Sequence, residues 1–343
     1  MDIASLNYTD LRLKTAEKIK NYLALSDYNR LTIGLYKEGK FYVFGEHAEE
    51  KCLLYNIGSI SKTVTAHLVL KLCEEGMLDI NCTVDRYLPL KKGKYPTLYQ
   101  LLTHTAGYHH LTPIEVTLPQ LICNGYARKN PYEDCSVKTI IKCLERRRFF
   151  GSRVRYGYSD FASAILAAVT EMVRNKPFSE LFEEFIQKDL GLINTHIEAD
   201  PDRRTPLAAQ GKKILPFWVW KKDNPYIAGG GLVSNIEDML CYVALQIESE
   251  KPYITSAHTV CGKSVLKSDN HLMCIGWHTY KCSNQLWHVG GVGTFRSSII
   301  LNKKQKLGVV VLGNAKGKST ASAHYIAKML YSELKKKRIR LEV

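Results

Sequence analysis

A serine and a lysine stand three residues apart in residues 57–66, which read IGSISKTVTA. One helical turn brings side chains at this spacing to the same face, so Ser59 and Lys62 can interact. A serine hydroxyl attacks poorly without an adjacent base, and a lysine serves as that base when its surroundings lower its pKa. At a helix start, the backbone N–H of Ser59 is also available to an oxyanion. The spacing indicates a candidate nucleophile, although it also arises by chance in chains of this length.

Four further stretches carry candidate site residues. They read LLTHTAG at residues 101–107, YGYSD at 156–160, GGGLVSNIEDM at 229–239 and HVGG at 288–291. Because side chains alternate along a strand, His288 and Gly290 are expected on one face, where a polar group and a gap meet the same ligand. Taken singly, Tyr158 and His288 are more typical of structural residues. Their joint occurrence with Ser59 and Lys62 favours a catalytic site.

Helical periodicity and capping residues predict the helices that position these groups. Residues 9–10 can cap a helix with apolar positions at three- and four-residue spacing, and another helix should run from Ser59 to about Gly76. A short capped helix is expected within residues 97–107. Ser159 and Asp160 precede a long apolar helix that reaches Met172, and a last amphipathic helix follows from Ser319.

Strand signals lie near the two ends of the chain. Residues 31–36 and 41–44 flank a glycine-containing turn and predict a hairpin. Residues 273–277, 286–289, 295–301 and 307–312 predict an antiparallel meander, whereas residues 79–176 show few strand signals. We therefore expect an α+β fold with two parts: residues 1–78 and 177–343 form an antiparallel sheet flanked by helices, and residues 79–176 form an α-rich lobe. The site should lie in the cleft between them.

Composition is typical of a globular protein, with 343 residues, 45% hydrophobic and 24% charged. The first residues lack the features of a secretory leader, and no apolar run is long enough to span a bilayer. The 10 cysteines are scattered without a C-x-x-C pair. Reduced thiols in a cytoplasmic protein are the expectation, with disulfides in a secreted protein as the alternative. His109 and His110 lack further ligands at useful spacing, so no metal and no cofactor are expected.

The net charge of +15 is spread over short basic clusters along the whole chain, among them 303–304 and 335–338. A nucleic-acid module more often concentrates such residues on one element with interleaved aromatics. The pattern favours a solvated surface that can also attract anionic substrates, and no specific nucleic-acid or membrane partner is expected. The oligomeric state is left open.

The five motifs and their order resemble the serine β-lactamase-related family, over nearly the whole chain. This family includes class C β-lactamases, D-alanyl-D-alanine carboxypeptidases, D-aminopeptidases and lactamase-like esterases. The resemblance implies a β-lactamase/transpeptidase-like fold and a serine hydrolase that acts through an acyl-enzyme. It is specific for the fold and the nucleophile but not for the substrate.

The resemblance also implies roles for individual residues. Ser59 would be acylated, Lys62 would hold or relay a proton, and Tyr158 would assist proton transfer. His288 stands where many β-lactamases have lysine and the esterase and peptidase branches have histidine. Gly290 would leave space for substrate. The backbone N–H of Gly291 would complete an oxyanion hole with that of Ser59, and one such donor is typically worth about 3 to 4 kcal/mol.

Two positions depart from the family pattern. Asp160 replaces the asparagine of the tyrosine motif, and residues 150–152 read FGS where relatives often carry Pro-Gly. An ionised aspartate only accepts hydrogen bonds, so recognition of a conventional β-lactam or acyl-amide is in doubt. Two roles are open for Asp160: pairing with Lys62, or accepting a hydrogen bond from a substrate ammonium or amide.

The expected substrate is a small-molecule ester or amide. A D,D-peptidase or β-lactamase proper is the alternative within the enzymes, and a non-catalytic relative that binds a ligand or partner in the cleft is the alternative from another class.

Overall fold

The computed structural model describes residues 2–45, 51–109, 112–113, 118, 130–147, 156–197, 209–210, 213–214, 218–261, 271–281, 283–315 and 322–341. Within them the largest element is a nine-stranded sheet in the order β1-β3-β2-β13-β12-β11-β10-β9-β8. The strands are β1 (Ile3–Ser5), β2 (Leu31–Lys37), β3 (Lys40–Phe44), β8 (Val260–Cys261), β9 (His271–Cys274), β10 (His278–Tyr280), β11 (Gln285–Val292), β12 (Phe295–Asn302) and β13 (Leu307–Gly313). Two short pairs lie outside it, β4 (Tyr55–Asn56) with β7 (Val233–Ser234), and β5 (Ala209–Gln210) with β6 (Lys213–Ile214).

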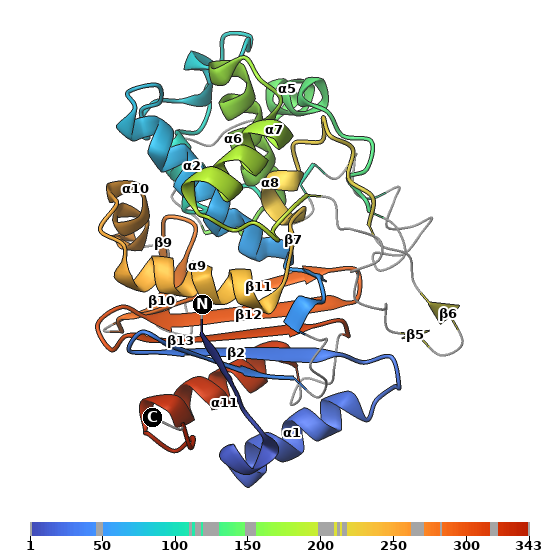
Figure 1. Ribbon diagram of the computed structural model, residues 1–343. Coiled ribbons are helices and arrows are strands. Elements are labelled where there is room, and N and C mark those ends of the chain that lie inside the picture. The colour runs from blue at the N-terminus through green and yellow to red at the C-terminus, as the bar shows by residue number, and fades with distance from the viewer. Residues whose placement is uncertain are drawn as a thin grey trace.

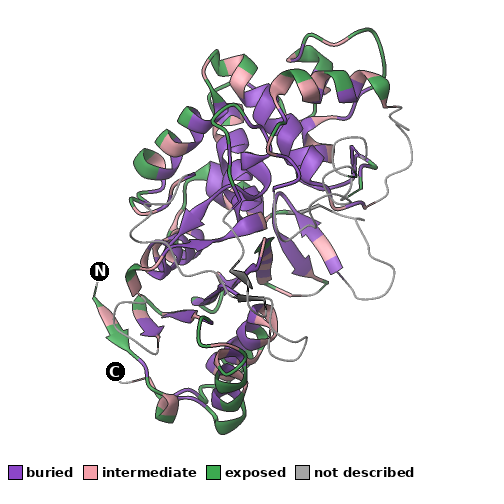
Figure 2. Ribbon diagram, turned by 90° about the vertical axis from the view of Figure 1, so that its right-hand side faces the viewer, coloured by how far each residue is buried: buried purple, intermediate pink, exposed green. Residues whose placement is uncertain are grey.

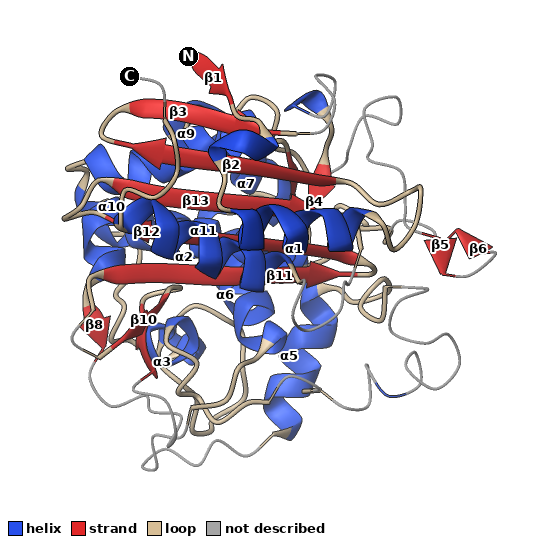
Figure 3. Cartoon of the chain, turned by 90° about the horizontal axis from the view of Figure 1, so that it is seen from below, coloured by secondary structure: helices blue, strands red, loops and turns tan. Residues whose placement is uncertain are grey.

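Helices cover both faces of the sheet (Figure 1). The terminal helices α1 (Leu13–Leu23) and α11 (Ala323–Lys335) lie on one face, and α9 (Ile236–Glu248) lies on the other. Figure 3 shows α1 and α11 lying over the strands of the central sheet. Beyond α9 follow α2 (Ser61–Glu74), α3 (Leu98–Leu102), α5 (Val137–Arg146), α6 (Asp160–Arg174), α7 (Phe178–Glu184), α8 (Ile227–Gly230) and α10 (Pro252–Thr255).

Side chains of β13 alternate between the two faces of the sheet, so this strand contributes residues to two hydrophobic cores. Val309 and Val311 are buried among the residues that pack under α1 and α11, whereas Val310 and Leu312 belong to the larger core on the α9 side. Figure 2 shows the buried residues concentrated in the central strands and in the helices stacked above them, with exposed residues on the outer helices.

Close approach of α9 to the sheet depends on a glycine in β13. A Cβ at Gly308 would lie 2.2 Å from Cγ1 of Val243, a distance that no side chain tolerates without a shift. The absence of a side chain therefore sets the helix-to-sheet spacing, and with it the height at which the helical layer lies above β11 and β12.

Most predicted elements are present, with differences in four places. The sheet is mixed rather than purely antiparallel, because β1 pairs in parallel with β3. The strand expected at 273–277 ends at Cys274, since Gly276 adopts a left-handed φ of 74° in a turn, and β10 follows that turn. The last helix begins at Ala323, and Ser319 lies outside the described residues.

The fourth difference is at Ser59, which lies in a 3-10 turn (Gly58–Ile60) rather than in the first turn of α2. The N–H and the hydroxyl of Ser61 both donate to the Gly58 carbonyl, so the chain forms a tight turn before the α-helix begins.

The division into 1–78 with 177–343 and 79–176 stays a prediction. The larger core is continuous across it, because Val69 of α2, Ile165 of α6 and Leu240 of α9 belong to one buried cluster. No helix within the described parts of the chain combines the length and the apolar character that a membrane crossing needs.

Candidate active site

Ser59 lies at the point where the helical layer meets β11. Its 3-10 turn packs on β11 and β12, and a hydrogen bond of 2.7 Å from the Ser297 hydroxyl to the Ile57 carbonyl ties the turn to the sheet. The Ser59 side chain is half-buried, so it remains open to a small reactant.

Lys62 is buried directly behind the serine. Its ammonium nitrogen lies 3.1 Å from Ser59 Oγ, 2.6 Å from Asp160 Oδ1 and 2.6 Å from the Gly229 carbonyl oxygen. Burial by itself lowers the pKa of Lys62, but the charge of Asp160 and the Tyr158 phenol outweigh it and raise that pKa above its usual value. Lys62 is therefore a cation that donates to Ser59 at neutral pH.

Tyr158 completes this group from the segment that precedes α6. Its side chain hydrogen-bonds to Ser59 and Lys62, and the Lys62 nitrogen lies 5.0 Å from the centre of its ring. Burial raises the pKa of Tyr158, and the adjacent Lys62 cation only partly offsets this effect. At neutral pH the pair consequently holds both of its protons, and one must leave before either group can act as a base.

Asp160 is the first residue of α6, which Ser159 caps by accepting from the Ala162 N–H. Only 12% of the Asp160 side chain is exposed. One carboxylate oxygen contacts Lys62, and the other accepts from the Tyr132 hydroxyl at 3.2 Å. Of the two contacts considered for Asp160, the structure contains the ion pair with Lys62.

His288 lies on β11 beside Tyr158, with ring centroids 6.3 Å apart, but its side chain has no exposed surface. The part that His288 plays in substrate binding stays a prediction. Its Nδ1 lies 2.8 Å from the Val289 carbonyl oxygen, which can only accept, so Nδ1 carries the hydrogen. Burial and the nearby Lys62 cation lower the pKa of His288 to about 3, and the neutral ring leaves Nε2 as an acceptor.

Gly290 lies where β11 meets the Ser59 turn, and its role in leaving space for substrate stays a prediction. A Cβ on this residue would lie 1.8 Å from the Ile57 carbonyl oxygen and 2.4 Å from Ser297 Oγ. The Ile57 backbone therefore fills the position that a side chain on residue 290 would occupy. The glycine lets the Ser59 turn pack against β11.

Gly291 is the next residue of β11, at the end of the contact between the Ser59 turn and this strand, and it is exposed. A Cβ on Gly58 would lie 2.5 Å from the Gly291 nitrogen, so the peptide that leads into Ser59 runs against Gly291. This packing is compatible with the predicted pairing of the Ser59 and Gly291 N–H groups as an oxyanion hole. That role stays a prediction.

Three neighbours of the site had been given no role from the sequence. The ring of His104 lies 4.6 Å from that of Tyr158, and His104 Nδ1 accepts from the Ser159 N–H. The Gly229 carbonyl binds Lys62, and Tyr132 binds Asp160. His104 and Gly229 lie in two of the motifs described above. Gly229 contacts Lys62 through its backbone carbonyl, however, and residue type does not predict a backbone contact. Tyr132 lies in no motif.

Residues 150–152 fall outside the described residues, as do His110 and three of the side chains of the 10 cysteines. Of the seven cysteines whose side chains can be described, three are buried, three are half-buried and Cys52 is exposed. Among the described residues, no three His, Cys, Asp or Glu side chains are grouped to hold a metal ion.

Comparison with solved structures shows the fold. A penicillin-binding protein homologue from Pyrococcus abyssi, described as octameric, superimposes with a TM-score of 0.76 at 22% identity, covering 95% of this chain and 77% of the other. A beta-lactamase/D-alanine carboxypeptidase from Pseudomonas syringae gives a TM-score of 0.72 at 17% identity, with 94% and 97% covered. These likenesses support the β-lactamase/transpeptidase-like architecture, with its mixed sheet flanked by helices.

Comparison with known sequences agrees. Protein flp of Staphylococcus aureus strain N315 is 24% identical over 277 residues, which are 76% of this chain and 52% of that protein. A beta-lactamase of Providencia stuartii is 28% identical over 241 residues, 66% of this chain and 56% of its own length. The chain thus spans about half the length of these relatives. The profile of the family described as Beta-lactamase matches residues 36–331, and the chain therefore belongs to the beta-lactamase family.

Proposed function

We propose that this protein is a serine hydrolase that cleaves a small ester or amide through an acyl-enzyme on Ser59. The observation that carries the proposal is the contact between Lys62 Nζ and Ser59 Oγ at 3.1 Å, made by a buried lysine that also hydrogen-bonds to Tyr158. A half-buried hydroxyl next to two proton-carrying groups is the arrangement that nucleophilic catalysis needs.

The reaction follows from these positions. Ser59 Oγ attacks the carbonyl carbon of the substrate, and its proton passes to the Tyr158–Lys62 unit. The N–H groups of Ser59 and Gly291 hold the negative oxygen of the tetrahedral intermediate. When the intermediate collapses, the unit returns the proton to the departing alcohol or amine. Water then attacks the acyl-enzyme by the same route and releases the acid.

The protonation states impose a condition on this scheme. Asp160 and Tyr158 raise the pKa of Lys62, and burial raises that of Tyr158, so the resting unit is an ammonium beside a phenol. Neither group accepts a proton in that form. The reactive enzyme has lost one proton from the unit, and kcat/KM is expected to increase from neutral to alkaline pH.

Two alternatives from the sequence are retained. A D,D-peptidase or β-lactamase activity is favoured by the names of the Pseudomonas syringae protein and the Providencia stuartii relative. A non-catalytic binding protein is favoured by the Lys62–Asp160 ion pair, because an ammonium held by a carboxylate is a poor base. The scattered cysteines, which form no C-x-x-C pair, support a reducing compartment such as the cytoplasm as part of the proposal.

A substrate panel separates these possibilities. Hydrolysis of p-nitrophenyl esters, D-amino-acid p-nitroanilides and nitrocefin is measured at pH 7 and 9 for the parent protein and for Ser59→Ala. Ser256→Ala is the matched control, because Ser256 is an exposed serine that bonds only locally, to the Pro252 carbonyl. Turnover of esters or amides that Ser59→Ala abolishes and Ser256→Ala preserves supports the proposal. Turnover confined to nitrocefin supports the β-lactamase alternative, and no turnover of any substrate supports a binding protein.

A further inference from the structure

A basic pocket lies at one end of the sheet. It has a volume of about 370 Å³ and is formed by the turn after β2, the turn between β12 and β13, and the last turn of α11. Five lysines and one acid line it: Lys37, Lys304, Lys306, Lys335, Lys337 and Glu38. The basic clusters at 303–304 and 335–338 are dispersed in the sequence, but the fold brings them to one place.

The strand register separates this pocket from the candidate active site. Ser297, which binds the Ser59 turn, pairs with Leu312 of β13, whereas the pocket begins at Leu307 of the same strand. These two positions are five residue steps apart along the strand, which is roughly 17 Å. A ligand in the pocket therefore does not occupy the catalytic cleft.

Few of the charges in the pocket are neutralised. Lys306 pairs with Glu248 at 3.1 Å. In the described parts of the chain, no carboxylate forms an ion pair with Lys37, Lys304, Lys335 or Lys337. The dipole of α11 favours cations at its last turn, but this stabilisation is small for exposed groups and serves Lys335 and Lys337 only. Four lysines without an ion pair among the described residues thus line one hollow, together with Lys306 and a single acid, Glu38.

The backbone beneath these side chains is fixed by hydrogen bonds. The Glu38 N–H donates to the Lys306 carbonyl at 2.9 Å, which joins the turn after β2 to the turn between β12 and β13. The Lys337 N–H donates to the Leu334 carbonyl at 3.1 Å and closes the end of α11. Buried Leu307 and Leu334 form the floor of the pocket. The lysines therefore extend from a rigid, partly apolar base.

We propose that this pocket binds the oligophosphate group of a small molecule. Its volume lies at the lower end of the range for small-molecule sites, too small for a nucleic-acid groove. Lysine binds phosphate as a compact point charge, and four lysines that form no ion pair with a described carboxylate match the three to four negative charges of a di- or triphosphate. The shared chemistry is a short chain of phosphates, either free or attached to an organic group that the apolar floor can contact.

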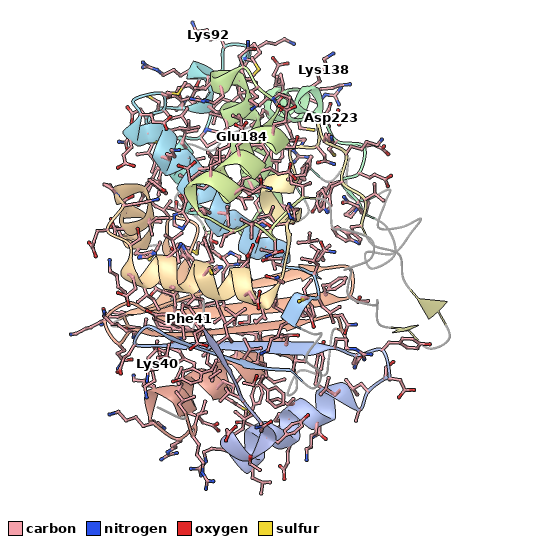
Figure 4. The ribbon with its side chains drawn as sticks, viewed as in Figure 1. Lys40, Phe41, Lys92, Lys138, Glu184 and Asp223 are labelled. Atoms are coloured by element: carbon pink, nitrogen blue, oxygen red, sulfur yellow. The ribbon has the colours of Figure 1, made fainter. Side chains whose placement is uncertain are left out.

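The test measures binding of sodium tripolyphosphate by calorimetry in about 150 mM NaCl, where charges more than about 8 Å apart are largely screened. The test variant carries Lys304→Glu and Lys335→Glu. The matched control carries Lys92→Glu and Lys138→Glu, which change two exposed lysines. Both lie at the opposite end of the molecule from Lys40, which directly follows the turn after β2 that lines the pocket (Figure 4). Each lysine-to-glutamate change removes two charges, so both double variants fall from +15 to +11. Melting temperatures check that both double variants fold. If the Lys304/Lys335 glutamate variant does not fold, a variant with Lys304→Ala and Lys335→Ala replaces it.

The proposal predicts binding at one site per chain, at least tenfold weaker in the Lys304/Lys335 variant and changed less than twofold in the control. ATP binding as tightly as tripolyphosphate identifies an attached phosphate chain, and tripolyphosphate alone identifies a free one. Equal losses in both variants would show diffuse surface charge and overturn the proposal, as would no binding of either compound. Tighter binding of a 20-nucleotide single strand than of ATP, lost in the same variant, would also overturn it in favour of a nucleic-acid partner.

Discussion

The ammonium of Lys62 lies 2.6 Å from the carboxylate of Asp160, inside the group that contains Ser59 and Tyr158. This ion pair raises the pKa of the lysine that the reaction needs as a proton acceptor. The carboxylate stands where the family pattern has an uncharged amide, so the resting state of the site differs from the one that the family motif implies.

Replacing Asp160 by asparagine should move the pH dependence of the reaction. Without the carboxylate, burial dominates at Lys62 and lowers its pKa, so the proton-free form becomes available at lower pH. We expect the rise of kcat/KM to shift toward acid by at least about one pH unit, equally for plain and amino-substituted esters. Asp134→Asn, which removes an exposed partner of Lys221, is the control.

The other role of Asp160 gives a different outcome in the same experiment. If its carboxylate binds a substrate ammonium or amide N–H, Asp160→Asn should lower kcat/KM for amino-substituted substrates far more than for plain acyl esters. A variant with both the selectivity and the pH profile of the parent protein would eliminate both roles.

Lys62 and Tyr158 should behave as one proton-transfer unit. Lys62→Ala and Tyr158→Phe should each lower kcat by about 10² to 10⁴, because each removes one member of a shared path. The double variant should be little slower than the worse single variant. Rate losses that multiply in a double-mutant cycle would show that the two residues act independently.

Sequence patterns anticipated the elements of this site better than its geometry. Capping by Ser159 and the spacing of Ser59 and Lys62 depend on local rules, and the structure follows them. The burial of His288 depends on packing between β11 and the helical layer, which no local pattern reports. The Gly229 carbonyl reaches Lys62 from a segment 167 residues away, and a backbone group leaves no trace in residue type.

Gly290 has a packing role that its motif does not reveal. On a strand, a glycine next to a suspected cleft suggests space for substrate, and the structure adds that the Ile57 carbonyl lies where a Cβ on Gly290 would be. This packing role depends on the tertiary contact between the Ser59 turn and β11, which the sequence does not specify.

Gly290→Ala should consequently destabilise the protein. Its new methyl group would meet the Ile57 backbone at 1.8 Å, and relief requires the Ser59 turn to move. Overpacking of this kind typically costs about 1 to 3 kcal/mol or more. Gly291→Ala is the matched control, because its nearest neighbour is the Arg296 side chain at 3.4 Å. Equal melting temperatures for the two variants would contradict the packing role of Gly290.

Buried histidines should make the fold sensitive to mild acid. Burial lowers the pKa of His67 and His324 to about 4 and that of His104, His258 and His288 to about 3. Between pH 6.5 and 5 these rings stay neutral in the folded chain but take up protons in the unfolded chain. Because the unfolded state binds more protons, the free energy of unfolding decreases as pH falls, by up to about 1.4 kcal/mol per pH unit for each proton.

Urea unfolding at pH 5, 6, 7 and 8 measures this effect. His67→Gln should reduce the slope between pH 5 and 6.5, since it removes one such group while an amide can still bond to the Tyr253 carbonyl. A stability that is flat, or that increases toward acid, would contradict buried neutral histidines.

Covalent labelling of Ser59 tests the central claim most directly. The protein is treated at pH 8 with a fluorophosphonate, or separately with a penicillin, and its intact mass and peptide map are measured. The account predicts one adduct per chain on the peptide that contains Ser59, absent in Ser59→Ala and retained in Ser256→Ala. An adduct on another residue that survives Ser59→Ala, or no adduct with an enzyme that still turns over esters, would contradict it.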